Sequence, residues 1–309
     1  MSDYHIPVML NQCLEGLDIK PNGIYVDLTY GGGGHAKEIL KVLSNDGKLI
    51  AFDQDDDAIK NKVQDDRLLL VKSNFRFLRR YLKYLGIDGV DGVLGDLGVS
   101  SFQFDEASRG FSYRFEDDLD MRMNHQIELN AADVLNKYDE RSLSDVFWRY
   151  GELKISRRLA KAVVERRRSA PFKETSDFID FLKPFVKQKP EKFWAVVFQA
   201  LRIEVNDEMA ALRQVLAEMP HVLNHQARIV VMSYHSLEDR IVKKFFRSGN
   251  IEGKIVKDMY GVVQNPFRVI TRKPIIPDEN EMELNSRSRS AKLRIAEFDK
   301  HKADNINEE

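Results

Sequence analysis

Four consecutive glycines, residues 31–34, stand between a short β-rich stretch and a segment with helical spacing. Glycine raises the entropy cost of folding, so a run of four indicates a backbone that another group must approach closely. Gly31, Gly33 and Ala36 match G-x-G-x-x-G/A, the pattern of a nucleoside-cofactor turn between a strand and its helix. Asp53 follows about 20 residues later, where an acid binds a ribose hydroxyl. These residues predict a nucleoside-cofactor site; a turn with redundant glycines is the alternative.

The acid before the glycines separates two candidate cofactors. A nicotinamide dinucleotide has a pyrophosphate, which favours a helix N-terminus and is repelled by a nearby carboxylate. S-adenosylmethionine has no phosphate and needs an acid for its ribose, a close backbone for its amino-acid end and an apolar contact for adenine. Asp27 places a negative charge beside the glycine turn. Because this charge tolerates an ammonium and a sulfonium, the sequence favours the methyl donor.

Strand and helix patterns alternate along the first hundred residues. Short β-rich stretches lie at 24–28, 48–55, 67–74 and 90–98, separated by segments with helical spacing. This alternation predicts a parallel, doubly wound α/β sheet, whose ligands bind beyond the carboxyl ends of the strands. Strand patterns return at 228–235, 267–272 and 292–298.

The chain between these strand regions is different. Residues 99–125 have no clear period and mix Ser, Phe, Asp and Arg, which indicates a functional loop. The pattern from 130 to 192 is helical, and 193–219 is longer helical sequence. Ser236 and Asp239 fit a capping box for a further helix.

The expected domain organisation is discontinuous. Residues 1–105 and 195–299 form the cofactor-binding domain, and residues 106–194 form a helical insertion that is the candidate for substrate recognition. Residues 300–309 are predicted to be a polar, frayed tail.

The composition describes a soluble protein with 48 Lys and Arg against 49 Asp and Glu. A nucleic-acid partner must therefore be attracted by a local patch rather than by the net charge. The single cysteine, Cys13, suits a reducing cytosol and leaves no intramolecular disulfide. The N-terminal residues 1–17 lack a basic stretch followed by a long apolar one, so they are not expected to be a secretory signal, and no apolar run approaches the ~20 residues of a membrane helix. We therefore expect a cytoplasmic protein without a membrane partner.

Several long motifs occur together in this chain. They are HIPVML, DLTYGGGGHA, FDQD, DLGVSSFQFDEASRGFSY (96–113), LDMRM (119–123), FQALRIEVNDE (198–208), SYHSLEDRIVKKFF (233–246) and SRSRSAKLRIAE (286–297). In this order they closely resemble the bacterial small-subunit ribosomal RNA cytosine-N4 methyltransferase family, known as RsmH or MraW. The resemblance runs from His5 to about Glu297.

The resemblance implies a class I methyltransferase (Rossmann-like) doubly wound sheet with an inserted all-helical domain. It implies S-adenosylmethionine as cofactor and methylation of the exocyclic N4 of one decoding-centre cytidine in 16S rRNA. The enzyme is expected to bind this rRNA within the small ribosomal subunit. The implied cofactor contacts are Gly33, Gly34, His35, Asp53, Phe75, Asp96 and Gln103. Three places depart from common patterns: Asp96-Leu97-Gly98-Val99 replaces the Asp/Asn-Pro-Pro-aromatic motif, Thr29 replaces a glycine, and Asn285-Ser286-Arg287 stands where Asn-Pro-Arg is expected.

Methyl transfer requires alignment of donor and acceptor and exclusion of water. Cytosine N4 is a poor nucleophile, because its lone pair is delocalised into the ring, and an acceptor bonded to one N4 hydrogen would make it more reactive. Asp96 is the main candidate for this acceptor, and Ser100 and Ser101 are weaker ones. Alternatively, Asp96 holds only the amino group of the cofactor.

Two kinds of chemistry are not expected. Methylation at cytosine C5 needs a thiolate, and Cys13 is predicted to be a buried apolar residue far from the motif loops. The seven histidines show no metal-ligand spacing, so no metal site is expected.

Basic residues in three places are candidates for RNA binding. Lys154, Arg157, Arg158 and Lys161 have the i, i+3, i+4, i+7 spacing of one helix face, which is either a phosphate-binding or a merely solvated surface. Arg109 and Arg122 lie in the loop after the fourth strand. Arg287 and Arg289 form the third cluster.

Two other functions are alternatives to RNA methylation. Tyr150 and Lys154 have the Tyr-x-x-x-Lys spacing of some nicotinamide-dependent oxidoreductases, but they lie inside the helical insertion. A non-catalytic RNA-binding module is the other alternative, and the intact glycine turn, Asp53 and Asp96 oppose it. The sequence does not distinguish a monomer from a homodimer.

Overall fold

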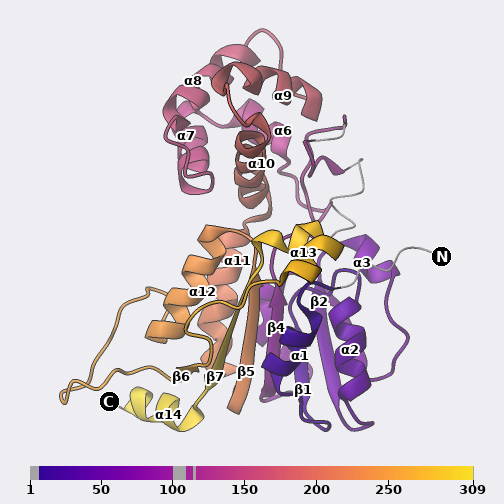
Figure 1. The fold of residues 1–309 in the computed structure, drawn as a ribbon, viewed down its shortest axis with the longest axis vertical. Coiled ribbons are helices and arrows are strands. Elements are labelled where there is room, and N and C mark those ends of the chain that lie inside the picture. Colours follow the sequence, from indigo (N-terminus) through magenta and orange to yellow (C-terminus); the bar gives the residue numbers. More distant parts are fainter. Residues whose placement is uncertain (1–6, 100–108, 114–115, 309) are drawn as a thin grey trace. The chain divides into compact units, whose positions relative to one another are not determined.

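The chain folds as two compact units in a computed structural model, which describes residues 7–99, 109–113 and 116–308. Unit 1 comprises residues 1–98 and 209–309, and unit 2 comprises residues 99–208 (Figure 1). The sequence-based boundaries after residues 105 and 194 differ from these, and the second falls inside the helix that spans residues 190–206.

Unit 1 contains a seven-stranded sheet in the order β3-β2-β1-β4-β5-β7-β6. Its strands are β1 (Ile24–Asp27), β2 (Lys48–Asp53), β3 (Leu68–Lys72), β4 (Val90–Asp96), β5 (Leu223–Ser233), β6 (Phe267–Val269) and β7 (Lys292–Phe298). Strands β3, β2, β1, β4 and β5 are parallel, and β7 is antiparallel to both β5 and β6. The predicted doubly wound sheet and its two closing strands are confirmed.

Helices lie along the sheet of unit 1 (Figure 1). They are α1 (Leu10–Leu17), α2 (Gly34–Val42), α3 (Asp56–Lys60), α4 (Leu78–Tyr84), α11 (Glu208–Glu218), α12 (Ser236–Ser248), α13 (Glu279–Leu284) and α14 (Lys300–Glu308), with 3₁₀ turns η1 (Phe75–Phe77), η4 (Met219–His221) and η5 (Ser286–Ser290). Residues of α1 and α2 pack with Leu49, Leu94 and Val230 in one core. Alternate strand residues point to the opposite face, where Phe52 meets the ring of Tyr81 at 5.7 Å.

Unit 2 is helical. Its elements are α6 (Ala131–Lys137), α7 (Glu140–Arg149), α8 (Ser156–Arg167), α9 (Thr175–Leu182), η3 (Lys183–Phe185) and α10 (Pro190–Asn206). They enclose a separate core rich in phenylalanine, in which Phe172 and Phe178 meet edge to face at 5.3 Å. Among the described residues, every helix of the protein is too short or too polar to span a lipid bilayer.

Two predicted elements differ from the structure. The helical sequence expected over 193–219 is interrupted, because Asp207 adopts a left-handed conformation (φ 50°) between α10 and α11. The tail expected to be frayed forms α14, which packs against β5 and buries Ala303. The packing against β5 thus orders a segment that is mostly polar.

Asn206 connects the end of α10 to the segment 119–123. Its amide nitrogen donates to the carbonyl of Met121 at 2.7 Å, and its amide oxygen accepts from the backbone N–H of Met123 at 2.8 Å. The side chain is 4% exposed, so water cannot replace these partners.

We expect Asn206→Ala to destabilise unit 2 by about 2–4 kcal/mol, because two buried backbone groups lose their hydrogen bonds. Urea unfolding of the full chain measures the change. Gln188→Ala, at an exposed position of the same unit, serves as the control and should leave the transition unchanged. Equal stability of the two variants would contradict the role assigned to Asn206.

Candidate functional site

Three neighbouring strands of unit 1 end in aspartates at the same edge of the sheet. Asp27 is the last residue of β1, Asp53 of β2 and Asp96 of β4. Strand β1 pairs with both others, and Asp27 lies opposite Ala51 of β2 and Leu94 of β4. The parallel register therefore gathers the three carboxylates at the edge where ligands of such sheets bind.

The glycine turn lies directly beyond β1. Gly31 and Gly33 have positive φ values of 52° and 73°, and Gly33 is the N-cap of α2. A Cβ on Gly33 would lie 2.5 Å from the hydroxyl of Tyr30, and one on Gly34 would overlap the ring of Pro7. A Cβ on Gly32 would meet no neighbouring atom among the described residues. Gly33 and Gly34 are therefore required by neighbouring side chains of the protein itself, a reason that spacing could not reveal.

Asp53 fastens the glycine turn to the second strand. Its Oδ2 accepts from the backbone N–H of Gly31 at 2.8 Å, and its Oδ1 accepts from that of Asp55 at 2.9 Å. Each carboxylate oxygen can accept more than one hydrogen bond, so capacity remains for a hydroxyl donor. Phe75 begins η1 after the third strand and is half-buried.

Asp96 is held by two residues from other strand ends. Its backbone N–H donates to Oγ1 of Thr29 at 2.7 Å, which gives this threonine a role in place of the common glycine. Its Oδ1 accepts from the hydroxyl of Tyr234 at 2.8 Å. Sequence reasoning missed Tyr234; its only signal was an aromatic residue at the end of the fifth strand pattern.

Burial raises the pKa values of all three carboxylic acids at this edge. The pKa rises to about 6 for Asp27 and Asp53 and to about 7 for Asp96. The charges of Asp53 and Asp96 raise the pKa of Asp27 further, whereas the hydrogen bond from Tyr234 lowers that of Asp96. Asp27 is 1% exposed; its Oδ1 accepts from Thr29, and its Oδ2 has no partner among the described residues. Ionising these three carboxyl groups therefore costs free energy, and a bound cation would lower this cost.

His35 lies between α1 and Asp96. Its Nε2 is 3.1 Å from the carbonyl oxygen of Val8, so Nε2 carries the proton. Nδ1 consequently faces Oδ2 of Asp96 at 3.9 Å. Burial lowers the pKa of His35, and the charge of Asp27 opposes this shift.

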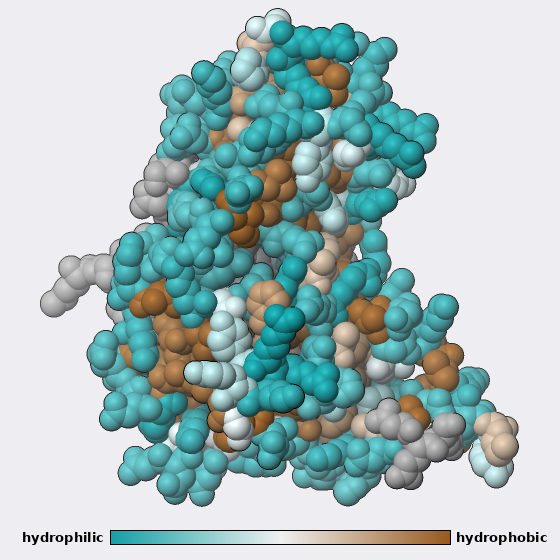
Figure 2. Space-filling model, turned by 180° about the vertical axis from the view of Figure 1, so that it is seen from behind, coloured by the Kyte–Doolittle hydropathy of each residue, from teal (hydrophilic) through white to brown (hydrophobic). Residues whose placement is uncertain are grey.

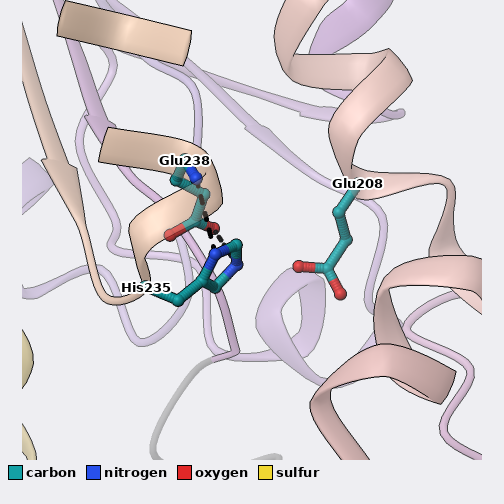
Figure 3. Close-up of side chains that lie close together, drawn as sticks. All are labelled: Glu208, His235 and Glu238. Carbon is teal, nitrogen blue, oxygen red and sulfur yellow. Dashed lines mark hydrogen bonds and ion pairs between the residues drawn. The ribbon is translucent and has the colours of Figure 1, made fainter. Parts of the chain in front are cut away.

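His235 caps α12, so the predicted Ser236–Asp239 capping box is wrong. Nδ1 of His235 accepts from the backbone N–H of Glu238 at 3.4 Å, and its Nε2 lies 3.2 Å from Oε1 of the same residue (Figure 3). Oε2 of Glu238 accepts from the backbone N–H of Tyr234 at 3.0 Å. Asp239 instead pairs with Arg294 at 2.6 Å. This buried pair at the start of α12 fixes the residue that contacts Asp96.

Cys13 is fully buried, as predicted, but its expected distance from the motif loops is wrong. Burial raises the pKa of its thiol, and so do the nearby charges of Asp96 and Asp27. The helix α1 packs against β4 and β5, which brings this cysteine beneath the carboxylates. A thiol that is held protonated and buried does not act as a nucleophile.

The basic face predicted in unit 2 is only partly present. Arg157, Arg158 and Lys161 are exposed on α8, whereas Lys154 lies in the turn before it. Arg158 stacks 5.5 Å from the ring centre of Phe185, and Nζ of Lys161 is 3.9 Å from Glu165.

The loop arginines predicted to bind RNA contact the protein itself. Arg109 is 4% exposed, and its guanidinium donates to the carbonyls of Arg122 and Met123 at 3.0 and 3.3 Å. The guanidinium of Arg122 makes two bonds to the carboxylate of Asp120, at 2.6 and 2.9 Å. Both therefore stabilise the loop. The burial of Arg109 corrects the expectation that it clamps a splayed nucleotide, and RNA binding by Arg122 stays a prediction.

The third basic cluster lies on η5. Arg287 is half-buried and Arg289 is exposed. Arg289 and Lys292 line an open pocket of about 320 Å³ together with Tyr234 and His235. Gln103, Ser100 and Ser101 lie outside the described residues.

The strand order, the antiparallel β7 and the acids around the glycine turn define a class I, Rossmann-like methyltransferase. Residues 2–299 match the MraW methylase family, and the chain belongs to this family.

Relatives of the same family are similar over almost the whole chain. Ribosomal RNA small subunit methyltransferase H of Parabacteroides distasonis is 55% identical over 298 residues, which are 96% of this chain and 98% of that protein. The protein of the same name from Bacteroides thetaiotaomicron is 51% identical over 295 residues, 95% of this chain and 97% of that protein.

The raised carboxyl pKa values predict that the unliganded protein loses stability as pH rises. The folded state binds protons more tightly than the unfolded state between about pH 4 and 7, so the free energy of unfolding falls through this range. For Asp27 alone, with a folded pKa of about 6, the loss between pH 5 and 8 is about 1 kcal/mol.

Asp27→Asn should therefore reduce the pH dependence of unfolding by about this amount. Urea unfolding of wild type and variant at pH 5 and pH 8 measures the difference. Identical pH dependence in the two proteins would show that Asp27 is not perturbed.

Proposed function

We propose that this protein transfers a methyl group from S-adenosylmethionine to the exocyclic N4 of a decoding-centre cytidine in 16S rRNA. The observation that carries this proposal is the half-buried carboxylate of Asp96, bonded to Tyr234 beside the glycine turn. The names of the relatives support a small-subunit ribosomal RNA substrate. The proposed setting is the small ribosomal subunit in the cytoplasm.

The charge of the site fits S-adenosylmethionine. Three carboxylates with raised pKa values lie at the edge where the cofactor would bind. A sulfonium and an ammonium would stabilise the ionised form of these buried carboxylates, whereas the pyrophosphate of a nicotinamide dinucleotide would disfavour it further. The oxidoreductase alternative gains no support, because Tyr150 and Lys154 belong to unit 2 and not to the sheet.

The proposed cofactor contacts follow from the strand ends. Asp53 has acceptor capacity for ribose hydroxyls, and Phe75 offers an apolar ring for adenine at the end of the third strand. The turn at Gly33 and Gly34, with His35, borders the amino-acid end, and Asp27 supplies negative charge beneath it. Gln103 is proposed from the family resemblance alone.

S-adenosylmethionine supplies an electrophilic methyl group on a sulfonium, which leaves as a neutral thioether. Asp96 accepts a hydrogen bond from one N4–H of cytosine, which localises the lone pair on N4 for attack. As the new N–C bond forms, N4 loses this proton, and a carboxylate with a pKa of about 7 is suited to accept it. Tyr234 fixes the carboxylate, and Thr29 fixes the backbone of Asp96. Ser100 and Ser101 remain weaker candidates for the acceptor.

The pocket beside Tyr234 is the proposed place for the backbone of the target nucleotide. Arg289 and Lys292 line it and supply positive charge for a phosphate. The cytidine itself must leave its stack to reach Asp96, as for other enzymes that modify a base.

The direct test is transfer of labelled methyl groups to small ribosomal subunits that lack the modification. We expect one label per subunit, and digestion to nucleosides should find it in N4-methylcytidine. Label at cytosine C5, or no transfer with intact cofactor binding, would refute the proposed reaction. Calorimetric titration should show binding of S-adenosylmethionine in preference to a nicotinamide dinucleotide.

Asp96→Asn should lower kcat by about 100-fold or more and change cofactor affinity only slightly, because the side-chain oxygen is kept but the base is lost. Weakened cofactor binding with an unchanged kcat would favour the alternative in which Asp96 holds the cofactor's amino group. Tyr234→Phe removes the hydrogen bond that lowers the pKa of Asp96. The rise of kcat/KM with pH should therefore move to higher pH in this variant, a shift that a merely structural role of Tyr234 would not cause.

The exposed part of the α8 face is proposed to contact rRNA. Reversing Arg157 and Arg158 to Glu should weaken binding to small subunits about tenfold and spare cofactor binding, because neither residue belongs to unit 1. Filter binding at fixed salt measures the change. Equal affinity would show that this face is only solvated.

A further inference from the structure

The positive charge of the chain is concentrated in a segment that sequence spacing had not singled out. Residues 240–273 contain nine lysines and arginines and only two acids, whereas the whole chain has a net charge of −1. The rest of the protein is therefore acidic. The segment comprises most of α12, the chain that follows it and β6, all within unit 1.

The basic residues of α12 form one stripe. Arg240, Lys243, Lys244 and Arg247 have the spacing i, i+3, i+4, i+7, and all four are exposed. The opposite face buries Ile241, Val242, Phe245 and Phe246 against the sheet. The buried face fixes the helix, so the stripe points to solvent by necessity.

Most of these cations have no acidic neighbour. Within the described part of the chain, no carboxylate lies within 4.0 Å of the side-chain nitrogens of Lys243, Lys244 or Arg247, nor of Lys254 or Lys257. Arg268, by contrast, pairs with Glu297 at 2.7 Å. Unpaired like charges on one face repel one another, and a polyanion would relieve this repulsion.

A hairpin follows α12 and projects from the sheet of unit 1 (Figure 1). Lys257 pairs with Val263 in an antiparallel bridge, and the N–H of Gln264 donates to the carbonyl of Val256 at 2.9 Å. Asp258 closes the turn, because its carboxylate accepts from the N–H groups of Tyr260 and Val262 at 2.9 and 2.8 Å. Because the carboxylate of Asp258 is hydrogen-bonded within the turn, the hairpin's charged side chains that remain for a ligand are lysines.

The tip of the hairpin is apolar and uncovered. Met259 is 88% exposed, Tyr260 84% and Val262 62%. Figure 2 shows apolar side chains among hydrophilic ones on the projecting part of unit 1, at the lower right. An exposed tyrosine on the same segment as exposed lysines is a combination that binds unpaired bases, because the ring stacks on a base while the cations bind phosphates.

The stripe also begins at the proposed reaction site. Helix α12 starts two residues after Tyr234, whose hydroxyl contacts Asp96. The four basic residues then lead along the helix towards the hairpin, away from the carboxylates. A strand entering the site would meet these cations in succession.

We propose that the outer face of α12 and the hairpin 254–264 form a docking surface for the rRNA strand that flanks the target cytidine. The α12 cations bind its phosphates, and Tyr260 stacks on an unpaired base. This inference rests on the proposed function and extends it to a second RNA-binding surface, separate from α8.

Charge decides between RNA and other occupants. A second copy of the chain in a symmetric contact would place the same cations against one another. The basic stripe and the lysines beside the apolar tip instead match a polyanion that also offers flat apolar faces, which single-stranded RNA does.

The test compares two triple charge reversals in the full-length protein. The first is Lys243→Glu, Lys244→Glu and Arg247→Glu. The matched control is Lys20→Glu, Lys48→Glu and Lys83→Glu, three exposed lysines of unit 1 outside this segment. Affinity for small subunits is measured by filter binding at several salt concentrations, and folding is checked by thermal melting and cofactor titration.

We expect the α12 variant to bind small subunits at least ~10-fold more weakly, and its plot of log affinity against log salt to be shallower by about two to three units. The control should stay within about twofold. Tyr260→Ala should weaken binding without changing the salt dependence, and Tyr260→Phe should retain it, because phenylalanine still stacks.

The outcomes that would contradict the docking surface differ from those that would contradict the proposed function. Equal affinity of the α12 variant and the control for small subunits refutes the docking surface. The proposal is also refuted if the α12 substitutions weaken only the self-association of the protein, measured by sedimentation. If wild type methylates subunits while the α12 variant binds and methylates them equally well, only this inference fails. If wild type transfers no methyl group to subunits, the proposed function fails instead.

Discussion

Three carboxylates gathered at one buried edge of a parallel sheet are the constraint on which the rest of the site depends. Each strand end contributes one acid, and the register of β1 with β2 and β4 leaves no freedom to separate them. Burial raises the pKa values of Asp27 and Asp53 to about 6 and that of Asp96 to about 7, and nearby carboxylates raise each of them further. Charge that is costly in the free protein becomes favourable when a cation binds, so the same feature that weakens the fold favours a sulfonium cofactor.

The protein holds this edge in place with its own contacts before any ligand binds. Asp53 fastens the backbone of Gly31, Tyr30 contacts Gly33, and Thr29 holds the backbone of Asp96. After the end of β5, the buried pair His235–Glu238 positions Tyr234 at the start of α12. Such preorganisation reduces what must be ordered during the reaction.

Sequence patterns predicted the sheet, its closing strands and the three acids, because strand period and strand ends are local properties. They could not predict Tyr234, since the contact with Asp96 joins residues 138 positions apart. They misassigned Arg109, because the carbonyls that bury it belong to a loop without any period. The break at Asp207 was missed for a similar reason: a non-glycine residue with positive φ leaves little trace in composition.

The basic residues of α8 and α12 show what residue spacing alone can predict. Lys154 to Lys161 and Arg240 to Arg247 have the same i, i+3, i+4, i+7 pattern. In the first, one member lies outside the helix, one stacks on Phe185 and one faces Glu165. In the second, all four lie on one helix above a buried apolar face. Spacing thus identifies a face, but neighbouring side chains decide whether its charge is available, and here they leave α12 with the more continuous positive surface.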